Sequence, residues 1–300
     1  MTRTFGATTA VLVLLAGTPT CAQAVVSIVA AENFYGDVAG QVAGPDATVT
    51  SALSNPDQDP HLFEASPSVA RAVADAAIVA YNGADYDPWM AKLLGAAPRS
   101  SNSGGDRRRV IVVADLVHRK VGDNPHLWYD PATMPAYART LTAALVAADP
   151  AHRAGYERRL QAFLDSLKPL DAEVAALRDR FAGTPVTATE PVFGYMAAAL
   201  GLRMRNERFQ LAVMNDTEPS ASDIAAFEAD LRGHRVRLLL YNSQATDAAA
   251  KRLLEIARQA GVPVVGITET EPEGMTYQQW IAAELDAVGA ALGGGDGSPR

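Results

Sequence analysis

Short apolar runs rich in β-branched residues alternate along the chain with longer amphipathic stretches. This alternation is typical of α/β layers in which most strands run parallel. In the first half it predicts strands over residues 25–30, 48–53, 77–81 and 110–114. The second half repeats the pattern, with strands predicted over 185–189, 203–209, 237–241 and 262–267. The sequence therefore predicts two lobes, each a mostly parallel sheet flanked by helices.

Three predicted helices begin with a side chain that can cap them, and in two of them proline takes the first helical position. These starts are Ser66-Pro67 before 69–76, Asp130-Pro131 before 134–148, and Ser220 with Asp223 before a helix that runs through Leu231.

A charged tract over residues 152–180 separates the two halves, and its apolar residues recur at helical spacing. A helix of about 28 residues extends roughly 40 Å, enough to brace two lobes. Pro169 lies inside the tract and should kink the helix or split it in two. The predicted organisation is an N-terminal lobe over 25–150, a connecting helix over 151–182, a C-terminal lobe over 183–292 and a flexible tail over 293–300.

Residues 1–24 have the features of a secretory signal peptide. Arg3 supplies positive charge, residues 11–16 form an apolar centre, and Ala22-Gln23-Ala24 matches an A-x-A cleavage site. The apolar run is far shorter than the ~20 residues that span a bilayer, and no later segment approaches that length. We therefore expect a protein that is secreted by a cleavable signal peptide, with no direct membrane insertion. Cleavage would also remove Cys21.

The charge balance is acidic: 34 Asp and Glu against 26 Lys and Arg give a net charge of −8. Loss of Arg3 with the signal peptide would make it −9. Such a chain repels nucleic acid and anionic lipid and tolerates cations. With one cysteine, the chain can form neither an intramolecular disulfide nor a Cys-based zinc site of the usual four-ligand kind. Any metal chemistry must rest on the five histidines and the acids.

Two histidines lie in matching segments, D-P-H-L-F at 59–63 and N-P-H-L-W at 124–128. Proline fixes its own φ and restricts the residue before it, so His61 and His126 are presented from a stiffened backbone. Both segments lie between a predicted strand and a predicted helix, where ligands bind in open α/β sheets. The other three histidines, His118, His152 and His234, are predicted to lie at the surface.

Acids in the second half occupy equivalent loops. Glu190 follows one predicted strand, and Glu269 and Glu271 follow another. Carboxylates and neutral imidazoles together suit a divalent cation, because both offer lone pairs and the acids neutralise its charge. The loop ends together predict a metal site in a cleft between the lobes.

Further segments join these residues: E-A-S-P at 64–67, Y-N-G at 81–83, and T-E at 189–190 before F-G-Y at 193–195. Through them the chain resembles the metal-specific solute-binding proteins of bacterial ABC importers, the zinc and manganese binders of the cluster A-I family. The resemblance covers nearly the whole mature chain. It implies two α/β lobes joined by a long backbone helix, with the metal between them.

The resemblance also implies a set of four ligands. The first two are histidines that match His61 and His126. The third is histidine in typical zinc members and glutamate in manganese and iron members, and here it is Glu190. The fourth is an acid after a late strand, usually aspartate in the family, for which Glu269 fits best and Glu271 is the alternative.

The implied function is capture of a divalent transition metal ion in the periplasm and its delivery to a cognate ABC permease in the inner membrane, by a monomer that is not an enzyme. Zinc and manganese both remain open. Two imidazoles with two carboxylates favour manganese, whereas the affinity order favours zinc. An acid that the family often has after the penultimate strand is replaced by Asn242.

Two alternatives belong to other classes, a secreted metal-dependent hydrolase and a metal-binding adhesin-like surface protein. A zinc hydrolase keeps three protein ligands and an open water position. The chain contains no H-E-x-x-H, G-x-S-x-G, GxxxxGK[ST] or G-x-G-x-x-G motif, so the common hydrolytic and nucleotide-binding machinery has no support. Nor does the sequence show the repeats typical of an adhesin.

Overall fold

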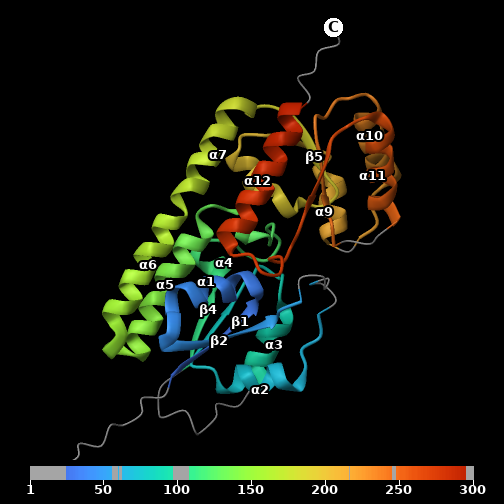
Figure 1. The fold of residues 1–300 in the computed structure, drawn as a ribbon. Helices are drawn as coiled ribbons and strands as arrows, with labels where there is room; N and C mark the ends of the chain where they lie inside the picture. The colour runs from blue at the N-terminus through green and yellow to red at the C-terminus, as the bar shows by residue number, and fades with distance from the viewer. Residues whose placement is uncertain are drawn as a thin grey trace, which may run out of the picture.

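The computed structural model describes residues 25–55, 60, 63–96, 108–215, 217–244 and 248–294. The predicted signal peptide, residues 1–24, lies outside this part of the chain, as do most of the predicted tail and the segment 97–107. The described residues form two α/β lobes, one above the other in Figure 1, with a long helical segment along one side. None of the helices in these residues is long and apolar enough to cross a membrane.

The N-terminal lobe is built on a four-stranded parallel sheet in the order β2-β1-β3-β4. Its strands are β1 (Val26–Glu32), β2 (Ala47–Leu53), β3 (Ile78–Tyr81) and β4 (Arg109–Val112). Its helices are α1 (Asn33–Ala43), η1 (Gly44–Asp46), α2 (Pro67–Asp75), α3 (Pro88–Ala96), α4 (Val113–Leu116), η3 (Leu127–Tyr129) and α5 (Thr133–Ala148).

The C-terminal lobe repeats this topology with a parallel sheet in the order β6-β5-β7-β8. Its strands are β5 (Pro185–Ala188), β6 (Arg203–Arg205), β7 (Leu239–Asn242) and β8 (Val264–Ile267). Its helices are η5 (Pro191–Phe193), α8 (Gly194–Ala199), α9 (Glu207–Met214), α10 (Ala221–Arg232), α11 (Ala248–Ala260) and α12 (Tyr277–Gly293). In each lobe the first strand lies between the next two strands of the chain, because the chain adds one strand on one side and then crosses to the other side. Ligands of open α/β sheets bind where the strand order reverses in this way, outside the carboxyl ends of the strands.

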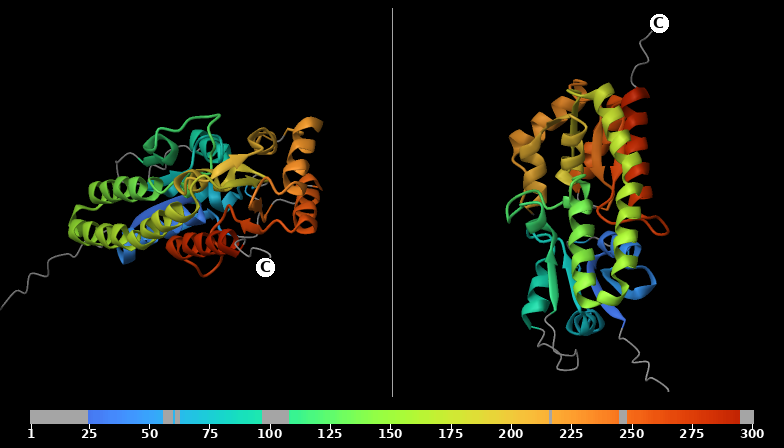
Figure 2. Two further views of the ribbon diagram at one scale, coloured as in Figure 1. Left: turned by 90° about the horizontal axis from the view of Figure 1, so that it is seen from above. Right: turned by 90° about the vertical axis from the view of Figure 1, so that its left-hand side faces the viewer.

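The predicted connecting helix is present, and its predicted split is confirmed. After η4 (Pro150–His152), α6 (Arg153–Ser166) and α7 (Lys168–Phe181) follow one another along the length of the molecule, separated at Leu167 (Figure 2). Pro169 lies in the first turn of α7, where a missing N–H removes no helical hydrogen bond. Gly289 of α12 allows a close approach, because a Cβ there would lie 2.8 Å from a methyl carbon of Leu177 in α7.

Aromatic rings fill the joint between the lobes. Phe34 of α1 lies 4.7 Å from Trp128 and 5.9 Å from Trp280 of α12, measured between ring centroids. Tyr129 lies 5.6 Å from Trp280 and 5.2 Å from Phe193 of the C-terminal lobe. All five rings are buried, and such pairs contribute about 0.5–1.5 kcal/mol each beyond the area they bury. The core is therefore continuous across the two lobes.

Most predicted elements are present, with differences at their ends. The Ser66 and Ser220 caps are confirmed, since each side chain accepts a hydrogen bond from the backbone N–H three residues on. Six of the eight strands are shorter than predicted. Among them, α4 begins inside 110–114, and β6 ends because Asn206 has a left-handed φ of 60°. Asp130 caps a turn rather than the helix itself: its side chain accepts from the Ala132 N–H, and α5 begins two residues later than its proline signal predicts.

Candidate metal centre

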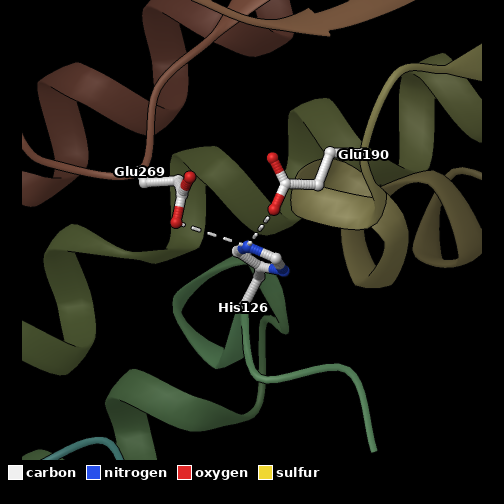
Figure 3. Close-up of side chains that lie close together, drawn as sticks. All are labelled: His126, Glu190 and Glu269. Atoms are coloured by element: carbon white, nitrogen blue, oxygen red, sulfur yellow. Dashed lines mark ion pairs between the residues drawn. The ribbon is translucent and has the colours of Figure 1, made fainter. Parts of the chain in front are cut away.

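Three of the predicted ligands come together where the two lobes meet (Figure 3). His126 immediately precedes η3 in the N-terminal lobe. Glu190 follows β5, and Glu269 follows β8 in the C-terminal lobe. A single ion at this position would therefore be bound by both lobes.

The separations between the three side chains suit one metal ion. His126 Nε2 lies 3.4 Å from Glu269 Oε2 and 3.9 Å from Glu190 Oε1. All three ligand atoms lie within 4.8 Å of one another, and the side chains are 0%, 1% and 5% exposed for His126, Glu269 and Glu190. Ligand atoms around a tetrahedral zinc ion with bonds of ~2.1 Å lie about 3.4 Å apart. Among the described residues, this is the group of three or more His, Cys, Asp or Glu side chains spaced for a metal ion.

Asn124 determines which nitrogen of His126 faces the site. Its Nδ2 donates to the Pro191 carbonyl at 2.7 Å, so its Oδ1 is the atom directed at His126. That oxygen accepts from the His126 backbone N–H at 3.1 Å and lies 2.6 Å from the ring Nδ1. Because an amide oxygen only accepts, Nδ1 carries the hydrogen, and Nε2 is the ring nitrogen that faces the two glutamates.

The Nε2 atom is buried and has no hydrogen-bond partner among the described residues. A buried polar atom left without a partner costs about 1–3 kcal/mol. A metal ion bound to the lone pair would remove this cost, and it would also neutralise the two buried carboxylates. The donor set therefore fits a divalent transition metal.

Other polar groups fix the two carboxylates. The Asn242 side chain donates to Glu190 Oε2 at 2.8 Å and to Glu269 Oε1 at 2.5 Å. The Tyr86 hydroxyl donates to Glu269 Oε2 at 3.1 Å. Burial, and next the charge of Glu269, raise the pKa of Tyr86 well above its ordinary value, so this hydroxyl remains a donor. Gln244 Oε1 accepts from the backbone N–H of Glu269.

The remaining predicted ligands are placed differently. His61 lies outside the described residues. Glu271 is not part of the three-residue cluster; its backbone N–H and carbonyl both bond to the side chain of Asn33 in α1. Burial, and next the charge of Asp37, raise the pKa of Glu271 to about 9, so this carboxyl is neutral at pH 7. The three histidines predicted at the surface, His118, His152 and His234, are all exposed.

Sequence analysis missed the residues that orient the ligands. Asn124 lies inside the N-P-H-L-W segment, and an amide two residues before a histidine could have indicated its role. The sequence singled out Asn242 only because it replaces an acid, and not as a donor to the two glutamates. Tyr86 and Gln244 carry no local signal, because their contacts to Glu269 span 183 and 25 positions along the chain.

Comparison with known proteins gives a consistent result. At 23% identity over 285 residues, the chain is similar to the manganese ABC transporter substrate-binding lipoprotein PsaA of Streptococcus anginosus, with 88% of each chain covered. It is 24% identical to the iron-binding protein YfeA of Yersinia pestis, covering 86% of this chain and 83% of that protein. The fold is similar to that of the periplasmic zinc binding protein TroA from Treponema pallidum, with a TM-score of 0.72, 20% identity, and coverage of 88% of this chain and 98% of that one.

A family model extends over most of the two lobes. The family described as zinc-uptake complex component A, periplasmic, matches residues 28–291, which include both sheets, the connecting helices and the three clustered ligands. The chain therefore belongs to this family of metal-binding components of ABC importers.

Proposed function

We propose that this protein captures a divalent transition metal ion, zinc or manganese, outside the inner membrane and delivers it to a cognate ABC permease. One observation carries the proposal: a buried imidazole Nε2 with no partner among the described residues faces two buried carboxylates from the other lobe. Relatives named for manganese, iron and zinc support this class of cargo.

The proposed ligands are His61, His126, Glu190 and Glu269. His126, Glu190 and Glu269 form the cluster described above. The assignment of His61 rests on the similarity between its segment and that of His126. Glu269 is preferred to Glu271 as the fourth ligand because Glu269 lies within ion-pair distance of His126. The bound ion is cargo, and with four protein ligands no open position remains for a catalytic water, so we propose no enzymatic role.

The organisation expected from the sequence forms part of the proposal. Residues 1–24 act as a cleavable signal peptide, which places the mature chain in the periplasm. Residues 25–150 and 183–292 form the lobes, residues 151–182 connect them, and residues 293–300 form a flexible tail. The mature protein acts as a monomer that docks on the permease.

Native mass spectrometry and thermal unfolding of the metal-stripped chain test the proposal. We expect one tightly held zinc or manganese ion per chain, and a thermal stabilisation on adding the metal because the ion binds the folded state. His61→Ala, His126→Ala and Glu269→Gln should each lose most of this stabilisation. Glu271→Gln is the matched control, because it is the same substitution two residues away and should keep the full effect. A full stabilisation in both histidine variants would overturn the ligand assignment.

A further inference from the structure

A tyrosine of the C-terminal lobe bonds the chain segment that presents His126. Tyr195 lies in the first turn of α8, shortly after Glu190. Its hydroxyl lies 2.7 Å from the backbone carbonyl oxygen of Asn124. Because a carbonyl only accepts, the tyrosine hydroxyl is the donor. This hydrogen bond therefore joins the C-terminal lobe to the residue that orients His126.

The ring of Tyr195 also contacts a cation of the N-terminal lobe. The guanidinium carbon of Arg119 lies 4.7 Å from the centroid of the ring, and a cation over the face of a tyrosine is attracted by the ring electrons. Arg119 is held in turn, since its Nη2 lies 3.6 Å from Asp130 Oδ2 and its backbone N–H donates to the Ala114 carbonyl. These contacts limit the movement of the ring and keep its hydroxyl on Asn124.

The chain segment that follows Glu190 contacts Asn124 at two further points. The Asn124 Nδ2 donates to the Pro191 carbonyl at 2.7 Å. The same nitrogen packs against the backbone of Gly194, where a Cβ would lie only 2.9 Å away from it. The remaining atom of the amide, Oδ1, accepts from the ring and the backbone of His126. The position of that acceptor is therefore coupled to the segment that carries the neighbouring ligand.

We propose that Tyr195 is a positioning residue of the metal site: by donating to the Asn124 carbonyl, it keeps the amide on His126 and the ring nitrogen Nε2 directed at the two glutamates. The inference rests on the proposed function, with His126 as a ligand. Without the hydroxyl, the peptide group of Asn124 is free to rotate. The Nδ1 hydrogen of the ring then loses its fixed acceptor, and Nε2 is no longer held in place for the metal.

The test measures the zinc affinity of the metal-stripped, full-length chain by competition with a chelator of known affinity. Tyr195→Phe keeps the ring beside Arg119 and removes the hydroxyl. It should raise the zinc Kd about tenfold, the lower end of the range for groups that orient a metal-bound histidine. Tyr137→Phe is the matched control and should leave the Kd unchanged, because its buried hydroxyl donates to the Tyr35 carbonyl within the N-terminal lobe.

A double-mutant cycle with Asn124→Ala, which removes the acceptor for the ring, tests the proposed route. In that background Tyr195→Phe should change the zinc Kd by less than about twofold, the precision of such cycles. Tyr277→Phe is the control for the cycle, because its hydroxyl donates to the Trp128 carbonyl at the other end of the same segment. It should change the Kd by the same factor in both backgrounds. A further tenfold loss from Tyr195→Phe beside Asn124→Ala would overturn the route through the amide.

The hydrogen on Nδ1 of His126 gives a second readout, since NMR detects such a hydrogen when a hydrogen bond protects it from exchange with water. The metal-free wild type should show this signal, and Tyr195→Phe should broaden or lose it. Lower stability of Tyr195→Phe with an unchanged signal and an unchanged zinc Kd would mean that the tyrosine is only structural. Wild-type chain that binds no metal would overturn the proposed function itself, whereas tight binding with the same Kd in Tyr195→Phe would overturn only the role of Tyr195.

Discussion

The side chain of Asn124 connects the two lobes at the residue that presents a proposed ligand. It accepts from both the ring and the backbone of His126, and it donates to the carbonyl of Pro191 in the C-terminal lobe. Groups that orient a metal-bound histidine typically contribute 10–100-fold to metal affinity. The two functions of this amide can be separated by substitution, because aspartate keeps the acceptor and loses the donor.

We predict that Asn124→Ala lowers zinc affinity about 10–100-fold, because the His126 ring loses the acceptor that fixes its tautomer. Asn124→Asp should stay within about tenfold of the wild type, since its carboxylate still accepts from Nδ1. Isothermal titration of the metal-stripped variants measures both constants. Equal losses of zinc affinity in the two variants would mean that the hydrogen bond to Pro191, and not the tautomer of His126, determines the affinity.

Glu284 of α12 is a buried acid whose burial favours its neutral form. The Tyr129 hydroxyl lies 2.7 Å from the Thr268 carbonyl and 2.5 Å from Glu284 Oε2. Burial is the largest cause that raises the pKa of Glu284 to about 7, against hydrogen bonds from Tyr129 and Thr268 that lower it.

This raised pKa predicts a specific pH dependence of stability. Between about pH 4.5 and 7 the folded state binds more protons at Glu284 than the unfolded state, so this contribution falls as pH rises and is constant above about pH 7. The loss amounts to about 3 kcal/mol. Glu284→Gln mimics the neutral acid and should lack this contribution. Urea unfolding of both metal-free proteins at pH 5 and pH 8 measures it, and parallel pH profiles would contradict it.

Sequence reasoning found the proposed ligands but not the groups that hold them, for a physical reason. Glu190 and Glu269 each come shortly after a strand of the C-terminal sheet, and the carboxyl ends of parallel strands meet at one edge. His126 lies between β4 of the other sheet and α5, in a strand-to-helix connection of the kind where ligands bind. That rule needs only strand positions, which periodicity supplies. The contacts of Tyr86 and Asn242 depend on how the lobes and strands pack, and no local pattern encodes such packing.

At the scale of elements, predictions were accurate where a cap or an apolar run defines the end and less accurate where the backbone turns. The helix from Ser220 begins where its cap predicts. Residues 203–209 were predicted as one strand, yet the left-handed φ of Asn206 ends the strand after three residues. Asparagine tolerates that conformation better than most residues, but a single asparagine is too common to predict it.

The turn after β3 is unusually constrained. Gly83, Ala84 and Asp85 all have positive φ, and the Gly83 N–H donates to Asp87 at 2.8 Å. At Gly83 the φ is 76°, and a Cβ would lie 2.6 Å from a methyl carbon of Val112 in β4. The position therefore requires glycine for both its conformation and its space.

We predict that Gly83→Ala lowers the free energy of unfolding by about 2–4 kcal/mol, through left-handed strain and displacement of Val112. Gly40 is the matched control: it lies mid-helix in α1, is exposed, and has open space where a Cβ would be. Gly40→Ala should raise stability by about 0.5–1 kcal/mol, because alanine favours the helix. Urea unfolding of the two variants provides the measurement. An unchanged free energy of unfolding in Gly83→Ala would show that the turn accommodates the methyl group without loss of stability.

At the scale of the whole molecule, the lobes are joined on several sides. The connecting helices α6 and α7 run beside them, and the aromatic cluster of Phe34, Trp128 and Trp280 fills the joint. Asn33 of the first lobe bonds the backbone of Glu271, two residues after a proposed ligand. The sequence predicted the long helix from its periodicity and its proline. It could not predict the contacts across the joint, because those residues are far apart in the chain.

This bracing predicts a small movement on metal binding. Wide hinge closure would separate the buried rings of the joint and expose apolar area, at about 25 cal/mol per Å². We therefore expect zinc to change the radius of gyration by less than about 1 Å, the scale of pre-organised binding. Small-angle X-ray scattering of the metal-stripped and zinc-loaded chain measures this, with His126→Ala as the variant that should not respond. A compaction of several ångströms in the wild type alone would mean that the joint opens and that the aromatic cluster is not a fixed brace.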